Sequence, residues 1–372
     1  MVKLNRFLED YFWPERESRL RKLILAPLYL LSFFYGGAVR ARAFLYRMGI
    51  LESQSLPCKV VSVGNITVGG TGKTPFTCLL AEMMQKRGLR VAVLSRGYKG
   101  TFTEPFRVVS DGQRILMEPR EAGDEPYLLA RKLAGVPVIV GRKRVQSGRY
   151  AVQKFNPEVI LLDDGFQHLA LRRDLDFLLI DSAVQFGNQT CLPRGVLREP
   201  LSHLSRADAF ILTKVEQSNN INNLKEKLDT WAQGRPTFGV AYVPEKILKA
   251  GDGDMLPAQE LEGKKVLAFC GIARPESFRS MLRKLNASIA HLEIFPDHYR
   301  YADRDWSNLV QKAEQLGVEA LLTTEKDWTR LADSGMSSSI PLWVLCIRHV
   351  FPESGGRERF EDFLFSRLGL TT

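Results

Sequence analysis

Cysteine is scarce in this sequence, and no two cysteines stand close together. The five cysteines among 372 residues are Cys58, Cys78, Cys191, Cys270 and Cys346. A disulfide framework or a zinc site is indicated by several closely spaced cysteines, for example in a CxxC pair. The spacing therefore indicates neither kind of site, and it fits a protein of a reducing compartment.

The sequence also lacks a long apolar run. The uncharged stretch near the N-terminus, Leu23 to Val39, has 17 residues and is interrupted by Pro27 and Gly36. A helix that crosses a membrane needs about 20 apolar residues. We expect instead a helix in or against the membrane interface; burial in a helical hairpin is the second interpretation, and a true span is the third.

Positive charge is concentrated at the N-terminus. The chain carries a net charge of +10, and half of that excess lies in the first 50 residues, with nine basic and four acidic side chains. Basic flanks favour anionic lipid head groups, and Trp13, Tyr29 and Tyr35 would lie near the interface. An anionic membrane surface is the expected partner, whereas no nucleic acid and no obligate protein partner is indicated.

The rest of the chain contains no internal repeat and no low-complexity tract, and its length suits two domains. From Lys59 onwards short aliphatic runs alternate with helical patterns, which is typical of βαβ units in a parallel sheet. Strands are expected at 59–63, 90–94, 136–140, 159–162, 177–180, 209–212, 265–270, 291–294, 320–323 and 342–346. Helices are expected at 75–87, 124–133, 142–154 and 224–231. The predicted division is an N-terminal membrane-associated segment at 1–50, a core domain at 51–240 and a smaller α/β domain at 241–372.

A glycine-rich loop follows the first expected strand. It reads Thr67-Val68-Gly69-Gly70-Thr71-Gly72-Lys73-Thr74, and its last three residues open a helix. Glycines let backbone N–H groups turn toward phosphate oxygens, and the helix N-terminus adds favourable partial charge. Lys73 is predicted to reach the β- and γ-phosphates of a nucleotide, and the Thr74 hydroxyl to bind Mg²⁺. Thr67 stands where this motif usually has its first glycine, and Gly69 and Gly70 are expected to supply the flexibility.

Two acids follow a buried strand further along the chain. Asp163 and Asp164 come directly after the run Val159 to Leu162. An acid at this place can hold Mg²⁺ directly or through water. Because neighbouring side chains alternate in direction, one aspartate is expected to face the metal and the other to support it; a helix cap is the alternative.

Loop and acids together predict an α/β fold: a P-loop NTPase-like parallel sheet with flanking helices, a second, smaller α/β domain and the N-terminal helix. The main alternative function is a GTPase or metallochaperone switch. Guanine recognition would need an NKxD motif, and the chain offers only Leu212-Thr213-Lys214-Val215. The switch is therefore disfavoured.

Several separate motifs resemble one family, the tetraacyldisaccharide 4'-kinases of lipid A synthesis, from about residue 20 to residue 365. They are the segments 65–75, Ser95 to Tyr98, Gly123 to Pro126, Asp163 to His168, Leu192 to Glu199 and Thr324 to Asp327. The resemblance implies transfer of the ATP γ-phosphoryl group to the 4'-hydroxyl of a lipid disaccharide 1-phosphate. It also implies a peripheral or N-terminally anchored enzyme at the cytoplasmic face of the bacterial inner membrane.

The resemblance assigns further residues. Asp124 would be the catalytic aspartate and His298 the histidine that assists it, beside Lys73. Glu199 would join Thr74, Asp163 and Asp164 at the metal. Residues implied to contact the lipid substrate are Arg96, Tyr98, Arg144 and Gln167.

Residue chemistry supports some of these roles and leaves others open. A carboxylate such as Asp124 can accept the proton of a sugar hydroxyl, although Asp124 also reads as a helix N-cap, where its pKa would stay low. His298, taken alone, is more typical of a satisfied surface histidine. The basic cluster around Arg144 could grip the acceptor's phosphate or form a solvated face. Glu325 and Lys326 follow a strand end, where adenine or ribose recognition is one interpretation.

Overall fold

The computed structural model describes residues 25–218, 220–251, 253–331 and 338–370. Trp13 and the basic residues ahead of Leu23 lie outside the described residues. Within the described residues the chain forms two compact units. Unit 1 comprises 25–96, 141–241 and 350–370, and unit 2 comprises 97–140 and 242–349.

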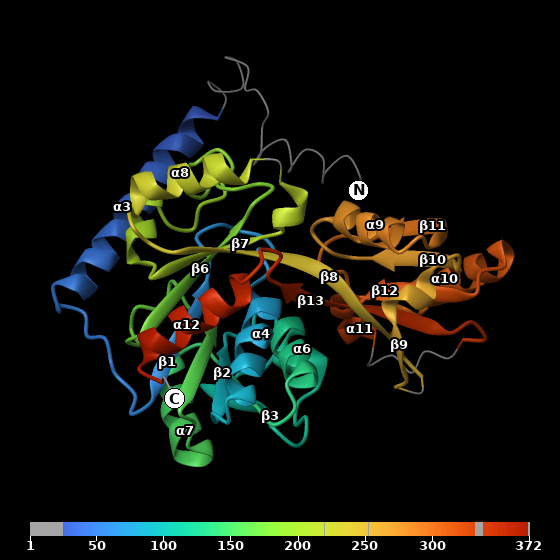
Figure 1. The fold of residues 1–372 in the computed structure, drawn as a ribbon, viewed down its shortest axis with the longest axis horizontal. Helices are drawn as coiled ribbons and strands as arrows, with labels where there is room; N and C mark the ends of the chain where they lie inside the picture. Colours follow the sequence, from blue (N-terminus) through green and yellow to red (C-terminus); the bar gives the residue numbers. More distant parts are fainter. Residues whose placement is uncertain (1–24, 219, 252, 332–337, 371–372) are drawn as a thin grey trace. The chain divides into compact units, whose positions relative to one another are not determined.

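Unit 1 is built on a parallel sheet (Figure 1). Its strands are β1 (Lys59–Gly64), β2 (Val91–Ser95), β5 (Val159–Asp163), β6 (Leu175–Asp181), β7 (Ala209–Thr213) and the first part of β8 (Thr237–Lys249). The order across the sheet is β8-β7-β6-β1-β5-β2, and every pairing is parallel. The strands are almost entirely buried, as expected for a sheet covered by helices on both faces.

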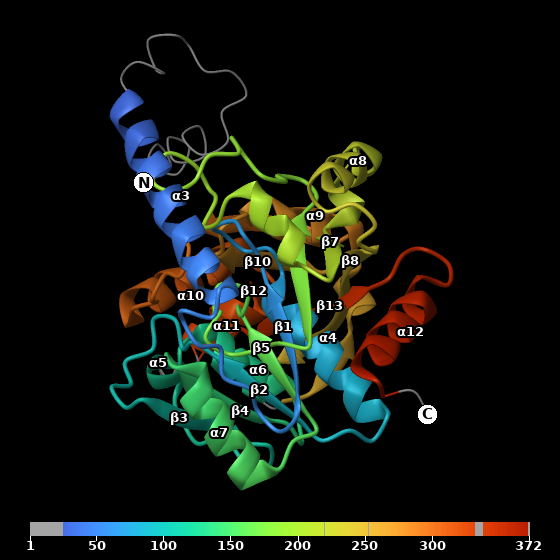
Figure 2. The same cartoon turned by 90° about the vertical axis from the view of Figure 1, so that its left-hand side faces the viewer.

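The helices of unit 1 complete the α/β architecture. They are α3 (Ala26–Arg47), α4 (Lys73–Lys86), α7 (Arg144–Phe155), α8 (Ile221–Trp231) and α12 (Gly356–Leu368), with short 3₁₀ turns at Leu201–Arg206 and Val215–Gln217. Helices α4 and α12 lie next to each other on one face of the sheet (Figure 2). There the ring of Phe360 packs edge-on against Phe76 and Phe238, with centroids 5.8 and 5.1 Å apart. This aromatic cluster ties the C-terminal helix to the helix that follows the glycine-rich loop.

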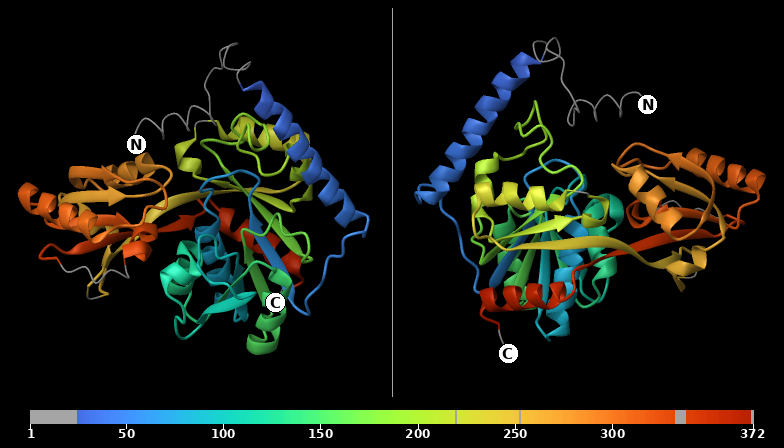
Figure 3. Two further views of the ribbon diagram at one scale, coloured as in Figure 1. Left: turned by 180° about the vertical axis from the view of Figure 1, so that it is seen from behind. Right: turned by 45° about the horizontal axis from the view of Figure 1, so that its top comes forward.

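Helix α3 runs as one continuous helix along the edge of unit 1 (Figure 3). Its inner face buries Ser32 and Gly36, and the Ser32 hydroxyl accepts a hydrogen bond from the Arg194 backbone N–H at 2.9 Å. On the other side Phe33 and Phe34 are 73% and 64% exposed. The described part of the predicted apolar stretch is thus helical from Ala26 onwards, with much of its apolar surface uncovered.

Unit 2 contains a second, mostly parallel sheet. Its strands are the second part of β8, β9 (Met255–Pro257), β10 (Lys265–Cys270), β11 (Ser288–Ile294), β12 (Ala320–Thr324) and β13 (Leu342–Val350), in the order β11-β10-β12-β13-β8 with β9 antiparallel to β8. The other elements are β3 (Phe106–Asp111), β4 (Pro137–Gly141), α5 (Pro119–Ala122), α6 (Asp124–Lys132), a 3₁₀ turn at Ala258–Leu261, α9 (Pro275–Lys284), α10 (Asp303–Leu316) and α11 (Glu325–Leu331).

Alternation along β10 builds two cores in unit 2. Val266 and Ala268 point into the core that contains Phe278 of α9, whereas Leu267 and Phe269 point into the one beneath α10. The predicted α/β class is confirmed. The predicted division at 51–240 and 241–372 stays a prediction about folding domains, while the compact units place 97–140 with the later segment.

Candidate active site

The glycine-rich loop joins the end of β1 to the start of α4, as predicted. Gly72 takes the left-handed backbone conformation, with φ of 89°, directly before Lys73 begins the helix. A residue with a Cβ rarely adopts this conformation, so glycine is needed at this turn. Inside the loop the Asn65 amide donates to the Thr71 hydroxyl at 2.9 Å. Buried polar contacts of this kind fix the loop's shape.

The loop is also held from the ends of β6 and β7. The Thr213 hydroxyl donates to the Thr71 carbonyl at 2.9 Å, and the Lys214 ammonium donates to the Gly70 carbonyl at 3.2 Å. Lys214 forms a buried ion pair with Asp181, with 2.5 Å between Nζ and Oδ2. The sequence indicated Thr213 and Lys214 only as a poor match to a guanine-recognition motif, and this contact was not predicted. The signal available was their place after a buried strand.

Asp163 is the last residue of β5 and Asp164 follows it, and the two contact different partners. Asp163 Oδ2 lies 3.4 Å from the Thr74 hydroxyl, and its Oδ1 lies 3.2 Å from that of Thr77. Asp164 instead faces Lys73, with 3.6 Å between Lys73 Nζ and Oδ1. The two carboxylates therefore point to different groups of the same loop and helix.

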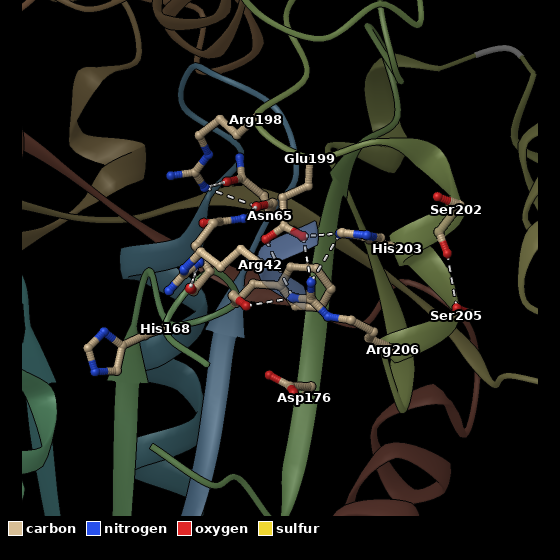
Figure 4. A network of polar contacts seen from close by, with 12 residues as sticks. Arg42, Asn65, His168, Asp176, Arg198, Glu199, Ser202, His203, Ser205 and Arg206 are labelled. Atoms are coloured by element: carbon tan, nitrogen blue, oxygen red, sulfur yellow. Dashed lines mark hydrogen bonds and ion pairs between the residues drawn. The ribbon is translucent and has the colours of Figure 1, made fainter. Parts of the chain in front are cut away.

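Asp164 is held by two cations. The Arg198 guanidinium donates to both of its carboxylate oxygens, at 3.0 and 2.8 Å. It also contacts the side-chain oxygen of Asn65 (Figure 4). Burial acts to raise the pKa of Asp164, but the charge of Lys73 and the hydrogen bonds from Arg198 outweigh it and hold that pKa well below its usual range. Asp164 is thus an ionised acid in a cationic setting.

The residues around Thr74 fit a magnesium ion. Mg²⁺ takes oxygen ligands, few of them from protein, and keeps water and substrate phosphates as the others. The hydroxyl of Thr74 and the carboxylate of Asp163 are oxygen donors that already lie 3.4 Å apart. Among the described residues no group of three or more His, Cys, Asp or Glu side chains is arranged to hold a metal. The pair would leave most positions on the ion to ATP and water.

Glu199 lies in a different environment. Its buried carboxylate lies 2.5 Å from His203 Nδ1 and 2.5 Å from an Arg206 guanidinium nitrogen (Figure 4). Burial acts to raise the pKa of Glu199, but the hydrogen bond to His203 and the charge of Arg206 outweigh it and lower that pKa. Arg206 also donates to the Phe166 carbonyl at 2.7 Å. Glu199 is therefore engaged by protein side chains, unlike an open metal ligand.

Two residues of unit 1 that were expected to contact the substrate, Arg144 and Gln167, form hydrogen bonds with other residues of the site. Arg144 is buried and donates to the carbonyls of Gly141, at 2.9 Å, and Asp163, at 3.3 Å. Burial lowers the pKa of Arg144 to about 10, although both aspartates oppose the shift. Gln167 donates to the Asn65 carbonyl at 2.8 Å. Arg96 is exposed at the end of β2.

Asp124 and His298 meet within unit 2. Asp124 is the first residue of α6, and its Oδ2 lies 2.9 Å from His298 Nδ1. The same oxygen accepts a hydrogen bond from Arg330 Nε at 2.8 Å. Burial acts to raise the pKa of Asp124, but the His298 hydrogen bond and the Arg330 charge outweigh it and lower that pKa to about 2. The Tyr98 ring packs edge-on against the His298 ring, with centroids 6.2 Å apart.

These features define a P-loop protein: a phosphate-cradling loop between a buried parallel strand and a helix, with an acid at the end of the adjacent strand. Comparison with known proteins gives the particular family. The sequence profile of the tetraacyldisaccharide-1-P 4'-kinases matches residues 24–368. The chain belongs to this family.

Individual relatives match this chain over most of their lengths. A tetraacyldisaccharide 4'-kinase of Desulfatibacillum aliphaticivorans is 42% identical over 351 residues, covering 92% of each chain. That of Syntrophotalea carbinolica is 39% identical over 359 residues, covering 96% of this chain and 97% of its own. The crystal structure of LpxK from Aquifex aeolicus in complex with ATP matches with a TM-score of 0.75 and 33% identity, covering 93% of this chain and 99% of that one.

Membership settles the activity. The chain is a kinase that uses ATP with Mg²⁺ to phosphorylate the 4'-hydroxyl of the lipid A precursor, a lipid disaccharide 1-phosphate. This confirms the function predicted from the sequence motifs. The alternative prediction, a GTPase or metallochaperone switch, is not supported.

Proposed function

We propose that residues Thr67 to Thr74 cradle the phosphates of ATP, with Lys73 on the β- and γ-phosphates. Thr74 and Asp163 would hold the magnesium ion, which would neutralise phosphate charge, and Asp164 keeps Lys73 and Arg198 in place until the nucleotide arrives. The observation that carries this proposal is the meeting of Lys73 and Thr74 with the two acids at the end of β5. Such positioning and charge stabilisation supply most of the catalysis in phosphoryl transfer.

Asp124 accepts the proton of the acceptor's 4'-hydroxyl in this proposal. A carboxylate whose pKa is about 2 is a weak base, so its main effect is to orient the hydroxyl and to take the proton late in the transfer. Its Oδ2 already accepts from His298 and Arg330, which leaves Oδ1 for the hydroxyl. His298 fixes the orientation of the carboxylate, and Tyr98 and Arg96 contact the lipid.

The membrane surface is the place where this acceptor is met. Helix α3 exposes the apolar side chains of Leu30, Leu31, Phe33 and Phe34 and carries basic residues at Arg40, Arg42 and Arg47. An apolar face with basic flanks favours the interface of an anionic membrane. Among the residues that the structure describes, no helix combines the length and apolarity that crossing a bilayer takes. We place α3 on the cytoplasmic leaflet, with no obligate protein partner.

The nucleotide and base roles are tested with the full chain, Mg·ATP and the lipid disaccharide 1-phosphate in detergent. Lys73→Ala should abolish formation of the bisphosphorylated lipid. Asp124→Asn should lower kcat by about 10² to 10⁴-fold while leaving ATP affinity unchanged, as expected for the loss of a base. Arg357→Gln, which removes an exposed helix pair with Glu361, is the matched control. Parent-like turnover in Lys73→Ala would refute the phosphate-loop assignment.

The membrane role is tested by vesicle co-sedimentation. Changing Leu30, Phe33 and Phe34 together to serine removes exposed apolar surface from α3, and we expect at least tenfold weaker binding to anionic vesicles. Trp231→Ser, at a 44% exposed aromatic residue on α8, is the control. Equal sedimentation of the triple variant and the control would count against interfacial binding by α3.

A further inference from the structure

Asp327, at the C-terminal side of β12, has no role in the assignments above, and Arg330 enters them only as a partner of Asp124. Asp327 belongs to the motif Thr324 to Asp327, for which sequence reasoning offered adenine or ribose recognition. Its side chain is completely buried, and Arg330 is only 4% exposed. Two charged side chains at such depth need partners that compensate their lost hydration.

Two partners of Asp327, Gly271 and Arg330, also contact Asp124 or His298. Asp327 Oδ1 accepts from the Gly271 N–H at 2.9 Å, from the Tyr301 hydroxyl at 2.9 Å and from Arg330 at 3.1 Å. Its Oδ2 accepts from the Thr324 hydroxyl at 2.6 Å. A buried acid with this many donors fixes their positions relative to one another.

Arg330 connects Asp327 to Asp124 and His298. Its Nε donates to Asp124 Oδ2 at 2.8 Å, and one terminal nitrogen donates to the Gly271 carbonyl at 2.9 Å. The other terminal nitrogen lies 3.3 Å from His298 Nδ1. The planar guanidinium thus holds the carboxylate and the ring in one fixed arrangement, which a flexible lysine would not reproduce.

Gly271 connects the same group of residues to the backbone of His298. Its carbonyl also accepts the backbone N–H of His298 at 3.1 Å, and His298 adopts the left-handed conformation with φ of 59°. A Cβ at position 271 would lie 2.9 Å from the Pro296 carbonyl oxygen and 3.1 Å from Asp327 Oδ1. Only glycine lets these backbone segments approach so closely, and the unfavourable backbone of His298 is kept by the contacts around it.

We propose that Asp327 and Arg330 are positioning residues for the phosphoryl transfer: Asp327 orients Arg330, and Arg330 holds the Asp124 carboxylate in the orientation that meets the acceptor hydroxyl. This inference rests on the proposed role of Asp124. It assigns the Thr324 to Asp327 motif to the acceptor side of the reaction and not to nucleotide recognition.

The pH dependence follows from the charges that face Asp124. They come from α6, α11 and the segment before Tyr299, and are Glu125, Lys326, Asp327, Arg330, Asp297 and His298. Glu125 pairs with Lys326 at 3.4 Å, so Arg330 and His298 dominate at the carboxylate. Removing the Arg330 cation raises the pKa of Asp124, and the acidic limb of kcat/KM for the lipid then moves to higher pH.

The experiment compares Arg330→Gln, Arg330→Lys, Asp124→Asn and the double variant Asp124→Asn/Arg330→Gln in the full chain. We expect Arg330→Gln to lower kcat about 10²-fold with unchanged KM for ATP, and to shift the acidic limb upward by one pH unit or more. Arg330→Lys should lose less. In the Asp124→Asn background, Arg330→Gln should cost less than threefold, because both changes remove the same function. The control is Arg279→Gln, which removes an ion pair between Arg279 and Glu276, both on helix α9.

The outcomes separate the two proposals. Parent-like turnover of Asp124→Asn would overturn the assignment of the base itself. A large loss in Asp124→Asn with an independent, multiplicative loss in Arg330→Gln, or an unmoved acidic limb, would overturn the positioning role alone. Should Arg330→Gln not fold, Tyr301→Phe removes one hydrogen bond to Asp327. It should lower kcat about fivefold in the parent and not at all in Asp124→Asn; equal losses in both would again overturn the proposal.

Discussion

The ion pair between Lys214 and Asp181 offers a sharp test of how the phosphate loop is held. Both side chains are buried, 8% and 4% exposed, and Lys214 also donates to the Gly70 carbonyl of the loop. Lys214→Met keeps the length of the side chain and removes its charge. The change leaves the Asp181 carboxylate buried without its cation and releases one carbonyl of the loop.

The expected loss of stability is large. Removing one partner of a buried ion pair costs about 3–5 kcal/mol, and for a unit of this size that lowers Tm by on the order of 10 °C. The second change, Asp181→Asn, removes the negative charge that Lys214 no longer balances and keeps a side chain of the same shape. Lys214→Met/Asp181→Asn should therefore recover at least half of the lost stability.

The loop contact predicts a different pattern for the nucleotide. Neither Lys214→Met nor the double variant restores the donor to Gly70, so both should bind Mg·ATP about tenfold more weakly than the parent by calorimetry at a temperature where all are folded. Asp181→Asn alone serves as the comparison in which Lys214 is retained. Recovery of stability together with full recovery of ATP affinity in the double variant would refute the idea that Lys214 supports the loop.

Three further predictions concern Asp124, Gly271 and Phe360. Because the pKa of Asp124 is lowered to about 2, its ionised form contributes about 2 kcal/mol of stability that is present above about pH 4 and is lost as pH falls toward 2; urea unfolding of the parent and Asp124→Asn should therefore differ most at neutral pH and converge in acid. Gly271→Ala should lower turnover more than ATP affinity, since its Cβ would meet the Pro296 carbonyl at 2.9 Å and displace the segment of His298; parent-like turnover would contradict this. Phe360→Ala should destabilise unit 1 by about 3–5 kcal/mol through the cavity it opens among Phe76, Phe177 and Phe238, measured by urea unfolding.

Elements with a strong local pattern could be predicted from the sequence. Strand β10 has the expected bounds, Lys265–Cys270, because its residues alternate between two apolar cores. Helices α4, α6 and α7 begin and end within two residues of expectation. Strand β8, Thr237–Lys249, was not foreseen. It lies between turn signals at Gly234 and Gly251, it contains Pro244 and Glu245, and its pairing with distant strands is not written in its own residues.

The residues of the site also differ in how well they could be predicted from the sequence. The phosphate loop and the acids after β5 are contiguous motifs, so their neighbourhood could be predicted, and Thr74 does lie beside Asp163. Arg330 and Lys214 belong to no such motif. Arg330 contacts Asp124, which lies 206 positions earlier in the chain. Lys214 contacts Gly70, which lies 144 positions earlier. Each of the two residues follows the end of a strand. Contacts of this separation depend on the whole fold, which single-sequence patterns do not contain.

Two acids, one in each unit, each lie between two basic side chains, which the motifs alone do not reveal. Asp164 lies between Lys73 and Arg198, and Asp124 between His298 and Arg330. An isolated ammonium or guanidinium at these depths would be costly, so the acids keep the cations in place before any phosphate is present. A triphosphate bound in the loop would compete with Asp164 for Lys73, and Asp164 would keep Arg198 as its cation. Asp124 has no such exchange, because Arg330 is tied to Asp327 behind it. The first acid therefore changes partners during the cycle, whereas the second remains fixed. We accordingly expect Asp164→Asn to change the affinity for Mg·ATP, measured by calorimetry, and Asp124→Asn to leave that affinity unchanged.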